Sequence, residues 1–354
     1  MRGWLLLAFF AAMLCGKVPA EQLLDFPPDV PVPIPVSVGV RLIKLEEIRE
    51  SEGTFSATLD VRLAWTDPRL STGRRGPRQL GSRAARASLE AIWDPGVQMQ
   101  NERSEQSDSV VDEALWISEK GEVEWIRRIR GSFEADFDTR NFPFDRQDLS
   151  LSFLGAEYDR NQITLVADEA AQQFAQGRLP EISGWEMRRG AVTSSLESHW
   201  NGNTHSRIAY EFSVRRDPWR YVAPIFTPVL ATLLVPVIAI WLNRWGENTL
   251  QIEAYEFMNL AVGGLFATIA LTLAVYSSYP FLSSGRNVVG YLFTLNYLLL
   301  AVAGLVILFL FRSQREEIPR FSPGVAYELY QGVCWAIPTA AVIAAGAIFF
   351  TALP

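Results

Sequence analysis

Four long apolar segments in the C-terminal part of the chain constrain its fold more than any other feature. They cover residues 221–242, 254–276, 288–311 and 325–350. Each is long enough to cross a hydrocarbon core of about 30 Å as an α-helix. Before residue 221, charged residues and turn formers recur throughout. The sequence therefore predicts a soluble domain at residues 21–217, followed by a four-helix membrane domain at residues 218–354.

Residues 1–20 have the pattern of a secretory signal peptide. Arg2 gives the positive start, residues 5–14 form a short apolar run, and Val18-Pro19-Ala20 resembles a cleavage site. The run is too short to span a bilayer, although a short N-terminal membrane anchor is the alternative. Export predicts that the soluble domain lies outside the cytoplasm.

The charges in the links between the apolar segments agree with an exported soluble domain. If the first helix enters from outside, the links holding Arg244 and residues 312–320 are inside, and the link holding Arg286 is outside. The inside links then carry more arginines, in agreement with the positive-inside rule. We expect a multi-pass protein whose C-terminus is outside.

The soluble domain has the pattern of an immunoglobulin-like β-sandwich. Residues 58–65, 122–126, 149–153 and 208–214 alternate apolar and polar side chains, which is typical of half-buried strands. Once the signal peptide is removed, the chain retains only Cys334, which lies in an apolar segment. The soluble domain cannot form a disulfide, so its core must stabilise it.

An arginine-rich stretch between residues 70 and 87 favours a solvated loop. An acidic ligand or nucleic acid is the alternative, but the net charge of −7 and the predicted export argue against nucleic acid as a partner. His199 and His205 lie close together in a polar stretch. They could sense pH or bind a metal, but we expect ordinary loop residues and no metal site.

The sequence contains no nucleophile elbow, phosphate loop or acid–base pair at a telling spacing. The prediction is a protein that is not an enzyme and that uses no cofactor.

The second apolar segment carries polar groups that are costly against lipid. At helical spacing one stripe starts acidic, becomes small and polar, and ends apolar: Glu256, Asn259, Gly263, Phe266, Ala270 and Leu273. In a ring of identical helices, Glu256 would form a carboxylate ring that attracts cations, and Phe266 would form a narrow apolar ring. The alternative is a helix that packs through Gly263, Gly264 and Ala267.

A motif in the middle of the chain resembles a known family. The run Asn141-Phe142-Pro143-Phe144-Asp145-Arg146-Gln147, followed by a strand, resembles the signature loop of pentameric ligand-gated ion channels, the Cys-loop receptor superfamily. Eukaryotic members have a cysteine on each side of this loop, and this chain has neither. In this respect the chain resembles the prokaryotic branch of the family. Further similarities follow in the family's order: Trp65-Thr66-Asp67-Pro68-Arg69-Leu70, Trp93-Asp94-Pro95, Asn101, Arg216, Pro228 and Pro280.

The resemblance implies a homopentamer, in which each chain meets four identical subunits around a pore lined by the second helix. Anion-selective relatives carry a Pro-Ala-Arg-like entrance, where this chain has Ala254-Tyr255-Glu256. Monovalent cations are therefore the expected permeating ions. The prokaryotic similarity implies the cell inner membrane, with contacts to membrane lipid and the soluble domain in the periplasm or outside the cell.

The agonist site of the family transfers poorly to this sequence. Members of the acetylcholine-receptor branch surround the agonist with aromatic side chains between subunits. This chain has Ala156 where they have the central tryptophan, with Tyr158 two residues later, and Gln100 where they have a tyrosine. A cation–π cage for an amine is not expected in that form. Trp125 and Trp200 complete the candidate ligand residues, with a core role as the alternative for Trp125. Residues 193–206 are expected to form a capping loop over an unknown small molecule, a proton or nothing.

The resemblance also implies a gating interface between the two domains. Its candidates are Phe142, Pro143, Phe144, Asp145, Arg216 and Pro280, with Glu50 and Glu52 in a strand turn and the loop of residues 279–284. An ion pair between Arg216 and Asp145 is expected, and a static salt bridge is the alternative to a gating role. The predicted function is a subunit of a cation-selective ligand-gated channel. A four-helix transporter or sensor with an exported binding domain is the alternative.

Overall fold

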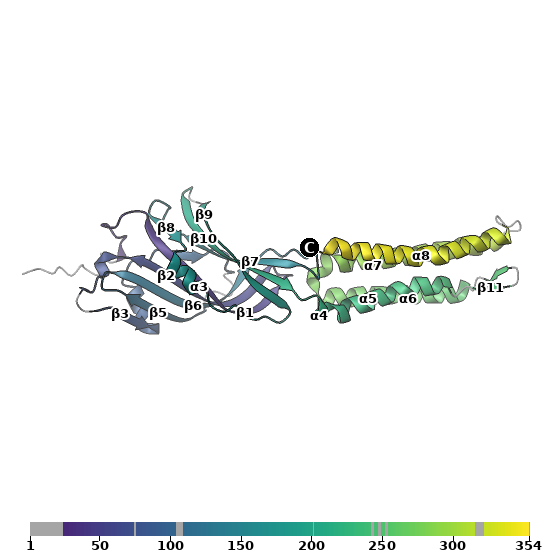
Figure 1. The fold of residues 1–354 in the computed structure, drawn as a ribbon, viewed down its shortest axis with the longest axis horizontal. Helices are drawn as coiled ribbons and strands as arrows, with labels where there is room; N and C mark the ends of the chain where they lie inside the picture. The colour runs from purple at the N-terminus through teal and green to yellow at the C-terminus, as the bar shows by residue number, and fades with distance from the viewer. Residues whose placement is uncertain are drawn as a thin grey trace, which may run out of the picture.

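The computed structural model is elongated, with β-strands at one end and helices at the other (Figure 1). The predicted β-sandwich followed by four long helices is confirmed. The predicted signal peptide lies outside the described residues. The structure describes residues 24–73, 76–103, 109–200, 202–241, 244–246, 249–251, 254–315 and 322–353.

Two sheets form the sandwich. In spatial order, the six-stranded sheet contains β3 (Arg78–Gly81), β5 (Ser109–Ile117), β6 (Glu122–Glu134), β2 (Thr54–Thr66), β1 (Ile34–Arg49) and β8 (Ile163–Val166). The four-stranded sheet contains β4 (Val97–Met99), β7 (Arg146–Gly155), β10 (Thr204–Arg216) and β9 (Trp185–Ser198). Strands β1 and β8 pair in parallel, and the other pairs are antiparallel.

Alternating side chains build the sandwich core, as the sequence predicts. In β2, Leu59, Val61 and Leu63 are completely buried, while the residues between them point to the other face of the sheet. On the opposite sheet, the hydroxyl of Tyr210 donates to the carbonyl oxygen of Val38 over 2.5 Å. Burial raises the pKa of Tyr210 to about 12, so the phenol stays protonated and keeps this link between the sheets.

Two expectations about loops hold only in part. In the arginine-rich stretch, residues 78–87 lie in β3 and in the helix α2 (Ser82–Leu89), where Ala85 is buried and Arg86 binds Glu113. The expected capping loop is the closed end of the hairpin of β9 and β10, and much of it is strand. His205 therefore lies in a strand with 1% of its surface exposed, and it is not an ordinary loop residue.

Among the residues that the structure describes, four helices are long and apolar enough to cross a membrane. The first consists of α4 (Trp219–Tyr221), a π-helical turn η4 (Val222–Phe226) and α5 (Thr227–Trp241). The others are α6 (Ala254–Ser278), α7 (Val288–Arg315) and α8 (Pro323–Ala352). A short ribbon of β11 (Arg244–Gly246) and β12 (Thr249–Gln251) precedes α6, and the 3-10 helix η5 (Pro280–Ser284) follows it. The predicted helix ends differ from these by a few residues.

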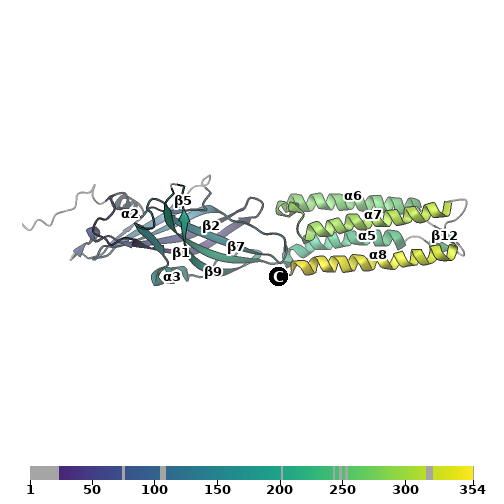
Figure 2. The same cartoon turned by 90° about the horizontal axis from the view of Figure 1, so that it is seen from above.

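Helices α6 and α8 lie on opposite edges of the bundle, with α5 and α7 between them (Figure 2). Near the middle of the bundle the amide of Asn296 on α7 donates to the hydroxyls of Thr232 on α5 and Thr268 on α6, over 2.7 and 3.0 Å. These bonds join three helices at two completely buried polar residues, Asn296 and Thr268. Thr268, a polar residue of the second apolar segment, therefore faces protein, as the sequence predicts.

Candidate functional site

The junction between sandwich and helices centres on Arg216, the last residue of β10. Its Nε donates to Oδ1 of Asp145 over 2.7 Å, and its Nη2 donates to Oδ2 of the same carboxylate over 3.0 Å. Nη2 also donates to Glu50 over 2.7 Å, and Nη1 donates to the hydroxyl of Tyr221 over 3.1 Å. The predicted ion pair is therefore a bidentate contact, extended by a second carboxylate from the β1–β2 turn.

This ion pair is buried. Arg216 and Asp145 each expose 2% of their surface. Burial by itself would lower the pKa of the Arg216 guanidinium, but the hydrogen bonds and charge of Asp145, together with Glu50, outweigh burial and raise that pKa. Arg216 therefore stays charged, and removal of one carboxylate would leave part of that charge uncompensated.

Aromatic rings enclose the same guanidinium. Its central carbon lies 4.1 Å from the ring centre of Trp185, 5.1 Å from those of Phe142 and Phe281, and 5.4 Å from that of Tyr221. These distances fall in the range of cation–π interactions. The rings come from the start of β9, the loop before β7, η5 and α4, so a single cation contacts all the segments that meet at the junction.

The loop before β7 reaches into the helix bundle. Phe142 is completely buried and belongs to the apolar cluster of the helices, where it packs against Tyr221, Phe226 and Phe281. Pro143 is also buried, and Phe144 is half-buried against the same cluster. The predicted motif therefore contacts the helices physically.

The remaining junction candidates differ in their positions. Pro280 is exposed, whereas its neighbour Phe281 makes the contacts with Phe142 and Arg216. Glu52 binds Arg49 on its own turn, and Glu50 is the turn carboxylate that reaches Arg216. Phe281 lies in the predicted loop of residues 279–284. Sequence reasoning missed Trp185.

The six predicted pore residues share one face of α6. Phe266 and Leu273 expose 68% and 67% of their surface. The other four, Glu256, Asn259, Gly263 and Ala270, are also exposed. The opposite face of α6 is buried in the chain's own bundle through Phe257, Gly264, Thr268 and Val275. A single chain therefore buries one face of α6 and leaves a polar-to-apolar face open.

Of the three small residues through which α6 could pack, only Gly264 contacts a neighbouring helix of the chain closely. A Cβ atom added to Gly264 would lie 2.5 Å from Cγ1 of Val235 on α5, so this close approach requires glycine. A Cβ at Gly263 would meet nothing within 4 Å, and Ala267 is exposed. Gly264 packs within the chain, while Gly263 belongs to the open face.

Gln100, a predicted ligand residue, lies in a polar network beside the β9–β10 hairpin. Its amide nitrogen donates to Glu197 over 2.5 Å, and its amide oxygen accepts from Ser152 and Arg207 over 3.0 and 2.9 Å. Arg207 and Glu197 form an ion pair with N and O 3.4 Å apart. Polar side chains thus connect the residue after β4 with β7 and the hairpin.

Tyr158 and Ala156 do not face this network. The hydroxyl of Tyr158 accepts from the indole of Trp93 over 2.9 Å, and its ring packs on Phe26 and Trp93. Burial raises the pKa of the Tyr158 phenol above its ordinary value, so it acts as a neutral partner. Ala156 is half-buried, and its backbone N–H donates to the carbonyl of Gly96.

The two predicted tryptophans lie on different sheets. Trp125 in β6 pairs with Leu63 and Leu115, which are buried, and it packs against the sandwich core. Trp125 therefore has the core role that was the alternative to ligand binding. Trp200 lies at the tip of the β9–β10 hairpin and exposes 89% of its surface.

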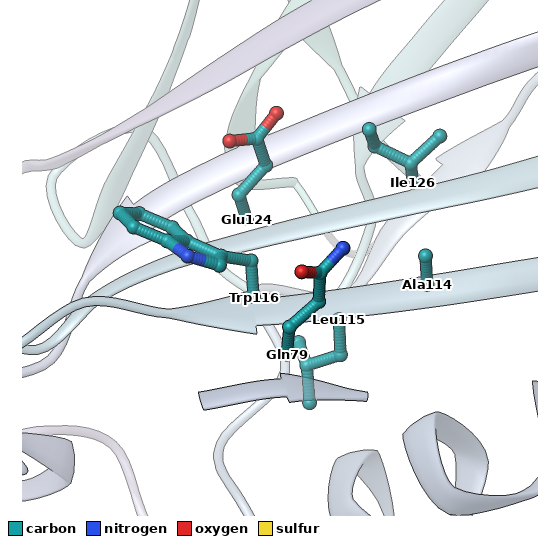
Figure 3. A pocket seen from close by; sticks show the side chains of 6 residues that line it. All are labelled: Gln79, Ala114, Leu115, Trp116, Glu124 and Ile126. Carbon is teal, nitrogen blue, oxygen red and sulfur yellow. The ribbon is translucent and has the colours of Figure 1, made fainter. Parts of the chain in front are cut away.

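A hollow that sequence reasoning missed lies on the outer face of the six-stranded sheet. It has a volume of about 400 Å³ and is lined by Gln79, Ala114, Leu115, Trp116, Glu124 and Ile126 from β3, β5 and β6 (Figure 3). Glu124 accepts a hydrogen bond from Arg62 over 2.7 Å. Because Arg62 neutralises this carboxylate, the hollow suits a small hydrogen-bonding ligand that packs on the indole ring.

The fold and the junction define a class of membrane protein. A β-sandwich is joined through a buried, aromatic-enclosed ion pair to four helices that are long and apolar enough to span a bilayer.

The chain belongs to the neurotransmitter-gated ion-channel family, because the family model for the neurotransmitter-gated ion-channel ligand binding domain matches residues 26–218. The resemblance stated from the sequence is confirmed. Membership and the four candidate spans together make the chain a multi-pass membrane protein.

Curated relatives agree with this family. The chain is 25% identical over 255 residues to a proton-gated ion channel of Gloeobacter violaceus, covering 72% of this chain and 67% of that protein. It is 22% identical over 272 residues to the acetylcholine receptor subunit beta of Xenopus laevis, covering 75% of this chain and 52% of that one. The match to the human gamma-aminobutyric acid receptor subunit rho-2 is 23% over 213 residues, covering 60% and 45%.

The chain thus spans about half the length of the receptor subunits that it matches. These relatives are channels and receptors, so the expectation that the chain is not an enzyme is confirmed by the comparisons.

Proposed function

We propose that the chain is a subunit of a homopentameric, cation-selective ligand-gated channel in which α6 lines the pore. The observation that carries the proposal is the open face of α6, which extends from Glu256 to Leu273 while the opposite face is buried in the chain's own bundle. Polar groups on a membrane helix face protein or water. In the proposed channel, Asn259 and Glu256 face a central water column between five copies of α6.

The order of side chains on this face supports cation conduction. Glu256 lies in the first turn of α6, at the end of the helix distant from the sandwich (Figure 2). Five such carboxylates would concentrate cations at one mouth of the pore. Phe266 and Leu273 would then form apolar rings that stop ions by dewetting when they are close together.

The junction supports transmission from the sandwich to this helix. Arg216 and Phe142 both contact Phe281, which lies in η5 directly after α6. A shift of the sandwich would therefore bear on the end of the pore helix through packed side chains, and opening would be a change of population between closed and open packings. A static salt bridge would hold the two parts together without shifting the agonist response.

The stimulus is proposed to act on the sandwich, as a small molecule or as a proton. The hollow beside Trp116 and Glu124 offers a carboxylate and an indole to a small ligand. Gln100 and Trp200 stay proposed ligand contacts at the hairpin, whereas Trp125, Ala156 and Tyr158 are engaged elsewhere in the sandwich. The proposed location is the cell inner membrane, with lipid around the bundle and the sandwich in the periplasm.

Reconstitution of the purified protein in a planar bilayer tests the proposal. Single-channel steps are expected, with a reversal potential in a KCl gradient that indicates cation selectivity. Glu256→Gln is expected to reduce that selectivity severalfold, whereas Glu328→Gln, at an exposed position of α8, is expected to leave it unchanged. Phe266→Ala is expected to raise the open probability. Phe350→Ala, at a side chain on α8 that is 76% exposed, is its matched control.

Coupled solute uptake without current steps would favour the transporter alternative. Cysteines placed at Asn259 and Phe266 in a Cys334→Ser background give a second measurement. Water-borne thiol reagents should modify both in at least one functional state, and protection of both in every state would rule out the pore.

A further inference from the structure

Two histidines lie together at the closed end of the β9–β10 hairpin. His199 directly follows β9, and its backbone N–H donates to the carbonyl of Asn203 over 2.9 Å. His205 is the second residue of β10 and pairs with Glu197 across the ladder. The centres of the two imidazole rings are 4.9 Å apart, and the ring planes are inclined by 54°.

The surroundings of His205 fix which ring nitrogen carries hydrogen. Nδ1 lies 2.6 Å from the carbonyl oxygen of Gly155 at the end of β7. A carbonyl only accepts hydrogen bonds, so Nδ1 carries the hydrogen and Nε2 of the neutral ring carries a lone pair.

Nε2 of His205 is buried and makes no hydrogen bond to any residue within the described part of the chain. His205 exposes only 1% of its surface. A buried acceptor without a partner is costly, so an explanation for Nε2 is required.

We propose that His199 and His205 form a two-histidine site for a transition-metal ion, Zn²⁺ or Cu²⁺, with water completing the coordination. Two imidazoles that bind one zinc ion tetrahedrally through nitrogens about 2.0–2.1 Å from the metal have ring centres roughly 5 Å apart. The observed separation is 4.9 Å. The bond from Nδ1 to the Gly155 carbonyl is the arrangement that orients metal-binding histidines in general and leaves Nε2 for the metal.

The chemistry of the neighbouring groups limits the site to two protein ligands. No group of three or more His, Cys, Asp or Glu suited to a metal occurs among the residues that the structure describes. The nearest carboxylate along the ladder, Glu197, is held by Gln100 and Arg207, and it neutralises the charge of Arg207. Binding should therefore be weaker than at structural zinc sites with four protein ligands.

A metal at this position would join the end of β9 to the start of β10 and so clamp the hairpin. The inference stands on the geometry of the sandwich alone and does not depend on the channel proposal.

Titration of the purified, tag-free full-length protein with ZnCl₂ in a calorimeter, and with CuCl₂ by electron paramagnetic resonance, tests the site. One ion per chain is expected, with two imidazole nitrogens coupled to the copper. His199→Ala and His205→Ala should each weaken binding at least tenfold. Leu196→Ala, at an exposed residue of β9, should leave binding unchanged.

His199→Ala is the decisive variant, because it leaves the bond between His205 and Gly155 intact and alters a half-buried side chain. Its melting temperature serves as the test of folding. Absence of binding to the wild-type protein at about 100 µM metal, coupling to fewer than two nitrogens, or undiminished binding when both histidines are replaced would each overturn the proposal.

Discussion

The sandwich and the helix bundle differ in how much of their apolar surface one chain can bury. Core side chains on both sheets of the sandwich, such as Val61 and Ile208, are completely buried. For each helix of the bundle, the buried share of residues in its most apolar stretch can be compared. This share is 39% in the first span and in α7, but only 17% in α6 and 11% in α8. The sandwich is complete within one chain, whereas the bundle is open along the two helices at its edges (Figure 2).

The difference shows where a second component is required. Water is the solvent of the sandwich, so its outer faces carry ion pairs such as those of Asp60 with Arg41 and Arg128. Lipid can cover the exposed apolar side chains of α8. The open face of α6 also carries Glu256 and Asn259, which are costly against lipid, and in the proposed channel this face meets other copies of the chain and water.

The largest expected effect is at the contact between the two regions. Asp145→Asn removes the bidentate partner of buried Arg216, and breaking a buried ion pair should lower the free energy of unfolding by about 3 kcal/mol. Thermal unfolding of the detergent-solubilised protein measures the effect. Glu181→Gln, which removes an exposed partner of Arg178, is the control and should leave the melting curve unchanged. Equal melting of the two variants would mean that the ion pair does not hold the regions together.

Adjacent glycines separate the buried and open faces of α6. Gly264→Ala forces a Cβ against Val235 and should cost about 1–3 kcal/mol of stability, the usual cost of overpacking. Gly263→Ala enters open space and should not lower the melting temperature. Melting temperatures of both variants measure the contrast. A reversed order of the two would mean that α6 is rotated relative to its neighbours.

The smallest effect concerns the sandwich alone. Burial of Asp60 opposes its ionisation, but hydrogen bonds from Arg128 and Arg41 outweigh burial and lower its pKa. Its contribution to stability is therefore complete above the pKa of an unfolded aspartate, about 3.9, and is lost as the pH falls through the lower folded value.

Asp60→Asn should consequently reduce stability by about 1 kcal/mol at pH 7, with the difference from wild type shrinking in strong acid. Melting curves between pH 2 and pH 7 measure this dependence. Glu90→Gln, at an exposed residue after α2, is the control. A difference that stays constant over this pH range would contradict the assigned charge state of Asp60.

Much of the fold could be predicted from the sequence because its signals are local. The alternation in residues 58–65 lies within β2, and the apolar run of residues 254–276 lies within α6. The loop expectation for the arginine-rich stretch failed where contacts distant in sequence decide. Strand β3 pairs with β5 and Arg86 binds Glu113, and hydropathy alone does not reveal those partners.

The candidate sites also contain residues that a local motif predicts and residues that only distant contacts bring in. The motif containing Phe142 and Asp145 pointed to the junction, and the partner Arg216 was found with it. Trp185 and Phe281 join them because β9 and η5 fold back to the same point, 31 residues before and 65 residues after Arg216 in the chain.

The amino-acid sequence by itself determined the order of the two regions, the four spans and the polar-to-apolar stripe of α6. These are properties of residue spacing, since a strand repeats every two residues and a helix about every 3.6. Only the tertiary structure decided that Gly264 packs while Gly263 stays open, and that His205 is buried beside His199. Burial depends on which elements meet in space, and spacing along one element carries no information about its neighbours.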